Sequence, residues 1–224
     1  MNKILVVEDE DILREVIVDY LIEDGYKVLE AADGEKALEL FQSEFVDLVI
    51  LDIVLPKVDG WSVCRRIRKN SNIPIIILTA RSDEDDSLLG YELGADDYLI
   101  KPYSPRVLMA KVKRFLGKST NTADAMQISS SGIVINMASR LAYVNGSVIY
   151  LTHTEFEILT YLMQNKGIVI NREQLIYKIW GYDFYGDEKT VNSHIRNLRA
   201  KLGSKGSCIV TVIRSGYKFE EEQL

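Results

Sequence analysis

The first half of the chain alternates short apolar runs with segments of helical periodicity. Runs rich in β-branched residues lie at 3–7, 27–31, 48–52, 75–79 and 98–100 and predict five strands. Between and after these runs, apolar residues recur at helical spacing over 12–22, 35–41, 63–69, 85–93 and 106–116. Strands that alternate with helices in this way predict an α/β fold with a doubly wound, five-stranded parallel sheet.

The second half follows a different pattern. Short runs at 133–136, 141–144 and 148–151 predict strands, and Asn145-Gly146 between the last two is typical of a type I′ hairpin turn. Thr152 and Glu155 form a capping-box pattern that opens a helix through 161, and helical spacing returns at 172–180 and 190–202. Runs at 209–213 and 217–220 predict a closing strand pair. Three helices flanked by antiparallel hairpins predict a winged helix.

A short polar segment separates the two patterns. Residues 119–125 read S-T-N-T-A-D-A, which is small, polar and without periodicity, as in a flexible linker. The sequence therefore predicts a first domain over 1–118, a linker over 119–125 and a second domain over 126–224.

Composition and charge narrow the class of protein. With 224 residues and 47% hydrophobic content, the chain can form two small folded domains. No apolar run approaches the roughly 20 residues that cross a bilayer, and the start lacks a signal peptide's features, so we expect a cytoplasmic protein without a membrane partner. Cys64 and Cys208 lack metal-ligand spacing and are expected to be reduced packing residues.

The charge is distributed unevenly between the two halves. Residues 1–124 carry 16 Lys and Arg against 24 Asp and Glu, a net charge of −8, whereas residues 125–224 carry 11 against 9, a net charge of +2. The two domains therefore have different electrostatic roles.

Chemically active residues follow the predicted parallel strands. Glu8 and Asp9 follow the first strand, Asp52 ends the third, Thr79 ends the fourth and Lys101 follows the fifth. Ligands of such sheets bind at the carboxyl ends of the strands, and three converging carboxylates need a hard cation such as Mg²⁺ to offset their repulsion. Asp52 is then the candidate nucleophile for an acyl phosphate, with Lys101 and the cation neutralising the phosphoryl oxygens and Thr79 donating its hydroxyl.

A structural interpretation exists for each of these residues alone. A single Asp at a strand end is usually a helix cap, and a single Thr is usually an ordinary strand residue. The complete order of acids, Asp, Thr and Lys after successive strands favours the phosphoacceptor.

Four segments resemble the receiver domains of two-component response regulators. They are V-V-E-D-E (6–10), L-D-I-V-L-P-K-V-D-G (51–60), L-T-A-R (78–81) and G-A-D-D-Y-L-I-K-P-Y (94–103), and the likeness spans about 1–117. The resemblance implies that a cognate sensor histidine kinase phosphorylates Asp52. It also implies that Glu8, Asp9, Asp52 and the backbone carbonyl of Val54 hold Mg²⁺, and that Lys101-Pro102 is a cis peptide.

The same resemblance identifies a switch and two departures from the family's pattern. Tyr98 matches the aromatic residue that turns inward when Thr79 moves toward the phosphate, although it could equally be an ordinary half-buried strand tyrosine. Tyr103 stands where the family usually has Phe, and Val54 often corresponds to Met.

The helix predicted at 190–202 is basic on its polar faces. Val191, Ile195, Leu198 and Leu202 form its apolar stripe, and six polar residues lie mostly on the other faces: Asn192, Ser193, Arg196, Asn197, Arg199 and Lys201. Arg and Lys suit phosphates and guanine edges and Asn suits adenine, so this helix could enter a major groove. A merely solvated helix would show the same charges. We expect His194 to face a phosphate or the neighbours of its helix rather than a metal.

Four further segments resemble the winged-helix output domains of the OmpR/PhoB type. They are L-T-H-T-E-F-E-I-L (151–159), N-R-E-Q-L (171–175), K-I-W-G (178–181) and the basic helix itself, and the likeness covers about 126–219. It implies that 190–202 is the recognition helix for double-stranded promoter DNA, that 209–219 is the wing and that 181–188 contacts RNA polymerase. Tyr182, Phe184 and Tyr185 in that loop could equally be packing residues.

The wing departs from the family's pattern. The chain reads T-V-I-R-S-G-Y over 211–217, where the family usually reads T-V-R-G-x-G-Y. Glycine there permits a positive φ, so Arg214 either tolerates strain or the turn takes another form. We expect Arg214 to reach the DNA backbone in either case.

The resemblance also implies that phosphorylated receivers form a homodimer. The apolar patch of the dimer face maps to Leu88, Tyr91 and Met109. Two intersubunit ion pairs map to Asp97 with Lys111 and to Asp96 with Lys118, whereas the third falls on Ser87 and Val107 and is lost.

These features favour a phosphorylation-switched transcription regulator over two alternatives. An aspartyl-phosphate hydrolase would need a second acid two residues after Asp52, where this chain has Val54. A regulator that dimerises without phosphate would not need the complete pocket. We therefore expect a DNA-binding protein and not an enzyme.

Overall fold

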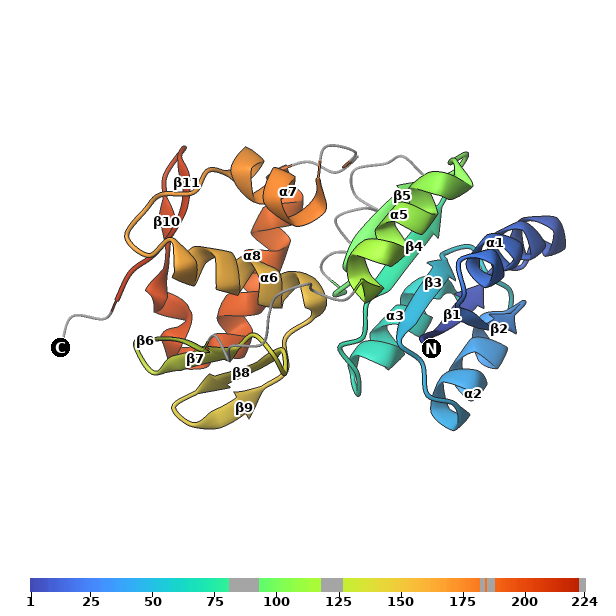
Figure 1. Cartoon of the computed structure of the whole chain (residues 1–224), viewed down its shortest axis with the longest axis horizontal. Coiled ribbons are helices and arrows are strands. Elements are labelled where there is room, and N and C mark those ends of the chain that lie inside the picture. Colours follow the sequence, from blue (N-terminus) through green and yellow to red (C-terminus); the bar gives the residue numbers. More distant parts are fainter. Residues whose placement is uncertain (81–92, 118–126, 182–183, 185–187, 222–224) are drawn as a thin grey trace. The chain divides into compact units, whose positions relative to one another are not determined.

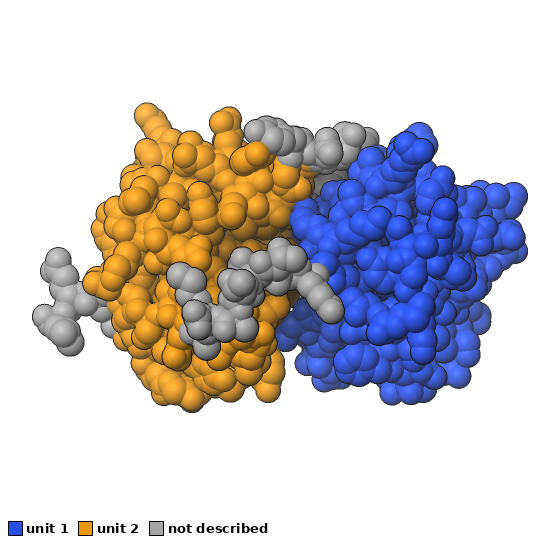
Figure 2. All heavy atoms as spheres, viewed as in Figure 1, with its two compact units in different colours: residues 1–119 blue, residues 120–224 orange. Residues whose placement is uncertain are grey.

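The computed structural model describes residues 1–80, 93–117, 127–181, 184 and 188–221. It divides the chain into two compact units, Met1–Ser119 and Thr120–Leu224 (Figure 2). This division falls within the predicted linker, whose own residues lie outside the described ones, so the predicted domain limits stay predictions. In the described part of the chain, no helix combines the length and apolar character that crossing a membrane requires.

The first unit is built on a five-stranded parallel sheet (Figure 1). Its strands are β1 (Lys3–Val7), β2 (Lys27–Ala31), β3 (Leu48–Asp52), β4 (Ile75–Thr79) and β5 (Asp97–Ile100), in the order β2-β1-β3-β4-β5. The predicted sheet is confirmed, and β5 alone begins one residue earlier than expected. Every residue of β3 and β4 is buried, as in strands covered on both faces.

Helices cover both faces of this sheet. They are α1 (Asp11–Glu23), α2 (Gly34–Ser43), α3 (Gly60–Arg68) and α5 (Pro105–Leu116), and the predicted helix at 85–93 lies outside the described residues. Helices α1 and α5 share one core with alternate strand residues such as Ile50 and Leu78. The intervening residues point to the opposite face, where α2 contacts β1 and β2 and α3 contacts β3.

The second unit opens with a four-stranded antiparallel sheet. Its strands, in spatial order, are β6 (Gln127–Ser130), β7 (Ile133–Asn136), β8 (Leu141–Val144) and β9 (Ser147–Ile149). Strand β6 was not predicted because Ile128 is its one large apolar residue. Asn145 and Gly146 have φ values of 49° and 81°, which confirms that both central residues of the β8–β9 turn are left-handed.

Three helices and a hairpin complete the second unit. Helices α6 (His153–Gln164), α7 (Arg172–Trp180) and α8 (Glu188–Leu202) precede a 3₁₀ segment (Gly203–Cys208) and the hairpin of β10 (Ile209–Val212) and β11 (Gly216–Phe219). The capping box of Thr152 and Glu155 is confirmed. The predicted apolar stripe of α8 lies in the core with α6 and α7. A Cβ on Gly216 would lie 2.1 Å from the Ile170 carbonyl oxygen, so the hairpin packs on that backbone only through glycine.

Candidate functional site

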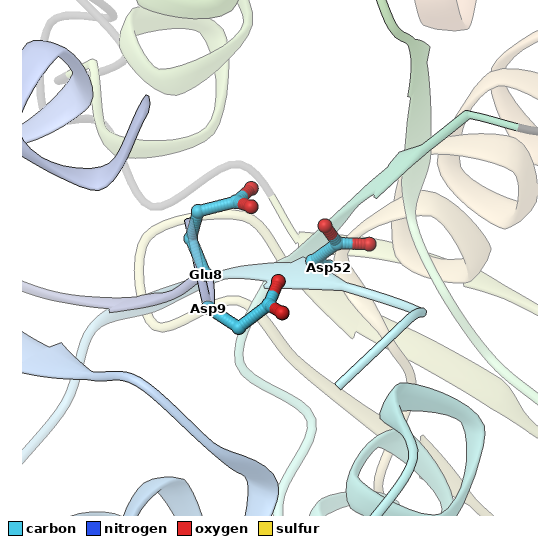
Figure 3. A group of neighbouring side chains, drawn as sticks. All are labelled: Glu8, Asp9 and Asp52. Carbon is cyan, nitrogen blue, oxygen red and sulfur yellow. The ribbon is translucent and has the colours of Figure 1, made fainter. Parts of the chain in front are cut away.

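Three carboxylates converge at the carboxyl edge of the parallel sheet (Figure 3). Glu8 and Asp9 follow β1 and Asp52 ends β3, which is paired with β1. One oxygen from each residue lies within 4.8 Å of the others. Glu8 and Asp52 are buried, whereas Asp9 is exposed. The predicted convergence of the acids is therefore confirmed, and the cluster opens to solvent on the side of Asp9.

Lys101 lies directly against the two buried acids. Its Nζ is 2.7 and 2.9 Å from the Glu8 carboxylate oxygens and 2.5 Å from Asp52 Oδ2. The backbone N–H of Lys101 donates to the Thr79 carbonyl oxygen at 2.7 Å, which fixes the loop after β5 to the end of β4. The Lys101-Pro102 peptide is cis, as the resemblance implied. One ammonium thus compensates two buried carboxylates, which would be costly to bury unpaired.

The pKa values reflect this shortage of positive charge. Burial, reinforced by the charge of Asp52, raises the pKa of Glu8 to about 7, although Lys101 opposes the rise. Burial lowers the pKa of Lys101, but its hydrogen bonds to Asp52 and Glu8 outweigh burial and leave the pKa above its ordinary value. A divalent cation would supply the missing positive charge, and the ligands are the hard oxygens that Mg²⁺ prefers. The residues therefore fit a Mg²⁺ site.

The loop after β3 is held close to Asp52. The N–H of Val54 donates to Asp52 Oδ1 at 3.0 Å, so the Val54 backbone lies beside the carboxylate. The expected role of the Val54 carbonyl as a Mg²⁺ ligand requires this closeness. A Cβ on Gly60 would lie 2.1 Å from the Asp52 carbonyl oxygen, so glycine is needed where α3 begins against this strand. The Val54 side chain is exposed where a hydrolase would need a second acid.

Of the three predicted switch residues, Thr79, Tyr98 and Lys101, the first two are buried. Thr79 is fully buried at the end of β4, and its register partner on β5 is Ile100. Tyr98 is 6% exposed, with its ring centroid 6.2 Å from that of Trp61 on α3. Tyr98 thus packs inward and is more buried than an ordinary half-exposed strand tyrosine.

Two residues near the pocket were not predicted to act there. Arg14 of α1 donates to the Glu8 carbonyl oxygen at 2.7 Å and so holds the loop that carries the acids. The hydroxyl of Tyr103 is buried and has no hydrogen-bond partner among the described residues. Burial and the charges of Glu8 and Asp52 raise the pKa of Tyr103. The departure from the family's Phe was a signal for Tyr103, whereas nothing in the local pattern marked Arg14.

On α8 the structure separates the predicted DNA-binding residues. Asn192 and Arg196 are exposed and Asn197 is half-buried. Ser193 is 5% exposed, which corrects its assignment to the polar face. The reason is that α8 contacts both α6 and α7, so its buried face is wider than the predicted stripe and includes Thr190 and Ser193.

Two basic side chains of α8 are engaged inside the domain. Arg199 donates to the Ile209 carbonyl oxygen at 3.0 Å and to Thr211 Oγ1 at 2.8 Å, which joins α8 to β10. Lys201 Nζ lies 2.6 Å from Glu155 Oε2, which also caps the start of α6. Lys201 therefore pairs with a residue of α6, and its predicted contact with DNA stays a prediction.

The wing turn resolves the alternatives left open for Arg214. Arg214 is exposed and has a φ of 60°, so it adopts the left-handed conformation that glycine would adopt more easily. Such a conformation costs about 1–3 kcal/mol in a residue with a side chain. The turn thus keeps its form at the expense of local strain.

His194 and Phe184 pack around Trp180. The His194 ring is 1% exposed and its centroid lies 5.4 Å from that of Trp180, so His194 faces its helix's neighbours and not a phosphate. The Phe184 ring lies 4.9 Å from Trp180 and packs against the core, as the alternative for this loop anticipated. Tyr182 and Tyr185 lie outside the described residues.

The charged residues predicted for the dimer face pair within their own chain. Asp97 is fully buried and lies 2.9 Å from Lys111 and 2.6 Å from Arg114. Asp96, also fully buried, lies 2.7 Å from Arg68. An intersubunit role would require these contacts to be exchanged. Leu88, Tyr91 and Lys118 lie outside the described residues.

Met109 does not share a face with Lys111. It is 5% exposed and lines a hollow between α1 and α5 together with Tyr20 and Asp24. Residues two positions apart on an α-helix point about 200° apart, so Lys111 faces β5 while Met109 faces α1. Its assignment to the apolar patch of the dimer face is therefore corrected.

Comparisons with known proteins agree with this arrangement. The family described as the response regulator receiver domain matches residues 4–113, and the family described as the C-terminal domain of transcriptional regulatory proteins matches residues 146–219. Two relatives come from Bacillus subtilis (strain 168). The transcriptional regulatory protein YclJ is 41% identical over 98% of this chain and 100% of its own length. The alkaline phosphatase synthesis transcriptional regulatory protein PhoP is 41% identical over 100% of this chain and 98% of its own length.

A solved structure is similar over nearly the whole chain. The response regulator DrrB of Thermotoga maritima, an OmpR/PhoB homologue, is 32% identical, and the likeness covers 98% of this chain and 99% of that chain with a TM-score of 0.53. Receiver domains bind Mg²⁺ at their acidic pocket, where this chain has Glu8, Asp9 and Asp52. The chain belongs to the OmpR/PhoB-type response regulators, which are two-component transcription factors and not enzymes.

Proposed function

We propose that Asp52 accepts a phosphoryl group from a cognate sensor histidine kinase. The observation that carries this proposal is the set of three carboxylates within 4.8 Å of one another, with Lys101 against two of them. An Asp52 oxygen would attack the phosphorus of a phosphohistidine, forming an O–P bond as the P–N bond breaks. Glu8, Asp9, Asp52 and the Val54 carbonyl would hold Mg²⁺, which supplies positive charge to the phosphoryl oxygens.

Phosphorylation would change the pairing of Lys101. In the structure its ammonium is shared between Glu8 and Asp52. A phosphoryl group on Asp52 presents additional negative oxygens to that ammonium, and the Thr79 hydroxyl could donate to the same group. A move of Thr79 toward this group would favour the inward position of Tyr98, in which the structure already shows that residue. The pocket would in this way bias a two-state receiver.

The second unit would bind double-stranded promoter DNA through α8 and the wing. The residues that support this proposal are the exposed Asn192 and Arg196, the half-buried Asn197 and the exposed Arg214. Arg199 would contribute mainly by holding β10 against α8. Basic residues of this kind contact phosphates, and a helix of this size enters a major groove.

Phosphorylation would promote pairing of two receivers. The proposed face includes Leu88, Tyr91, Asp97 and Lys111, with Asp96 and Lys118 as a second charged pair. Sedimentation with and without acetyl phosphate separates phosphate-driven dimerisation from phosphate-independent dimerisation, because only the former predicts a monomer without phosphate.

RNA polymerase is a further proposed partner, and it would contact residues 181–188. The need to reach the chromosome supports the cytoplasm as the place of action.

The phosphoacceptor is tested by treating the full chain with acetyl phosphate and Mg²⁺ and measuring the mass of the intact protein by mass spectrometry. The wild type should gain the mass of one phosphoryl group, and Asp52→Asn should gain none, because an amide does not form the acyl phosphate. Asp19→Asn, at an exposed position of α1, is the matched control and should be labelled like the wild type. Labelling of Asp52→Asn at the wild-type level would contradict the proposal.

A further inference from the structure

Asn192 is exposed on α8, but its amide oxygen already accepts two hydrogen bonds within the domain. Arg172 Nε donates to Oδ1 at 3.1 Å, and the Tyr217 hydroxyl donates to the same oxygen at 2.6 Å. An amide oxygen has two lone pairs, so both of its acceptor positions are used. The adenine-binding geometry usual for asparagine needs that oxygen as an acceptor.

The orientation of this amide follows from its partners. A guanidinium group only donates hydrogen bonds, so the Asn192 atom that faces Arg172 must be the oxygen. Turning the amide over would place its N–H groups against the N–H of Arg172. The Nδ2 group, with two donors, therefore occupies the other arm of the amide.

The partners of Asn192 are themselves fixed. Tyr217 is 4% exposed, and two guanidinium groups lie near its ring: the Arg172 carbon is 5.0 Å from the ring centroid and the Arg199 carbon is 5.8 Å from it. Arg199 is bound in turn to β10. Residues from α7, α8 and both strands of the hairpin thus hold the amide before any ligand arrives, so little ordering is required on binding.

We propose that Asn192 acts on DNA as a hydrogen-bond donor only and selects a keto base over an amino base. In the major groove guanine presents the O6 and N7 acceptors and thymine presents O4, whereas cytosine presents an amino donor and adenine presents an amino donor beside its N7 acceptor. A donor-only amide favours guanine or thymine, because at adenine a contact to N7 would bring its N–H groups against the neighbouring amino group. This inference rests on the proposed DNA-binding role of α8, and it replaces the adenine preference expected from an unconstrained asparagine.

The test is selection of random-sequence duplexes by the full chain treated with acetyl phosphate, followed by sequencing. Asn192→Ala identifies the base pair that Asn192 reads, because selectivity is lost there. At that position the wild type should favour a keto base by roughly three- to tenfold, the effect of one hydrogen bond. Asn192→Asp is the matched variant: it keeps an oxygen for Arg172 and Tyr217 but replaces the outer donors with an acceptor. It should turn the preference to adenine or cytosine.

A second variant tests the constraint itself. Arg172→Met combined with Tyr217→Phe removes both internal donors, so the amide oxygen becomes available and adenine should be admitted. A wild-type preference for adenine or cytosine would overturn the inference, as would an Asn192→Asp variant that still selects a keto base.

Failure of the inference can be told apart from failure of the proposed function. If Asn192→Ala alters no position while Arg196→Ala weakens binding, α8 binds DNA but Asn192 does not read it, and the inference is overturned alone. A wild type that binds no duplex would overturn the proposed function and the inference with it.

Discussion

The acidic pocket and helix α8 place their charged groups by different means. In the pocket, Glu8, Asp52 and Lys101 lie at the carboxyl ends of three strands of one sheet, and the chain gives each side chain little choice of direction. On α8, basic residues are spread around a helix, and Arg199 and Lys201 are bound to β10 and to Glu155. The pocket concentrates charge for chemistry, whereas α8 uses part of its charge to assemble the domain.

The difference shows what fixes a functional side chain. The carboxyl ends of parallel strands meet at one edge of the sheet, so residue order alone brings the acids together. A helix surface borders several elements, and a long basic side chain can bind any acceptor within reach. The first arrangement is robust to the details of packing, and the second depends on them.

The largest effect is expected from the buried charges of the first unit. Lys111→Met should lower the free energy of unfolding by about 3 kcal/mol, because Asp97 is fully buried and, among the described residues, would keep Arg114 as its one charged partner beside the backbone N–H of Tyr98. The free energy of unfolding of this unit is measured by urea denaturation, monitored through the fluorescence of Trp61 in a Trp180→Phe background. Lys113→Met, two residues away on α5 and mostly exposed, is the control and should show no resolvable change. Equal effects of the two substitutions would remove the distinction between buried and surface charge.

A smaller effect is expected on α8, where two arginines should separate stability from DNA binding. Arg199→Ala should destabilise the second unit by about 2 kcal/mol, because hydrogen bonds from a charged group to Ile209 and Thr211 are lost. Arg196→Ala, at an exposed position, should leave stability within about 0.5 kcal/mol and weaken DNA binding. Thermal denaturation and a DNA-binding titration of both variants measure the two properties. If Arg196→Ala were the more destabilising, the assignment of internal and external roles would be reversed.

The buried hydroxyl near the pocket gives a prediction of opposite sign. Tyr103→Phe should raise the free energy of unfolding of the first unit by about 1 kcal/mol, because it removes a buried polar atom that has no partner among the described residues. Tyr26→Phe, which removes a hydroxyl elsewhere in the same unit, serves as the control in the same denaturation assay. A destabilised Tyr103→Phe would show that the hydroxyl makes a favourable contact.

The wing should show a similar small gain in stability at a cost in binding. Arg214→Gly should stabilise the second unit by about 1 kcal/mol, because glycine adopts a φ of 60° without strain. It should also weaken binding to all DNA sequences similarly and reduce the slope of log affinity against log salt by about one unit. Arg214→Ala should show the same reduction in the slope of log affinity against log salt, but no gain in stability. An unchanged salt slope in both variants would show that Arg214 does not contact a phosphate.

Much of the fold could be predicted because the hydrophobic pattern is strong. Strands β1 to β4 have the predicted bounds, since each contains a run of apolar, mostly β-branched or leucine residues that polar residues delimit. Strand β6 could not be found because Ile128 is supported by few apolar neighbours in sequence. The acids and Lys101 of the pocket could be predicted to converge because the strands carry them to one edge.

The errors in the site came from helix faces and long side chains. Ser193 was misplaced because α8 is buried on two sides. Met109 was misplaced because it and Lys111, two positions away on α5, face different neighbours. The pairing of Lys201 with Glu155 joins residues 46 positions apart, which no local pattern reveals. The acceptor bonds to Asn192 come from two other elements and could not be read from the sequence of α8.

We expect phosphate at Asp52 to control DNA binding by the second unit. The most direct test is a titration of the full chain, with and without acetyl phosphate and Mg²⁺, against duplexes selected by the phosphorylated wild type. Acetyl phosphate should increase the affinity of the wild type and of Asp19→Asn, and it should leave the affinity of Asp52→Asn unchanged. An equal increase for Asp52→Asn, or no increase for a wild type shown to be phosphorylated, would contradict the account.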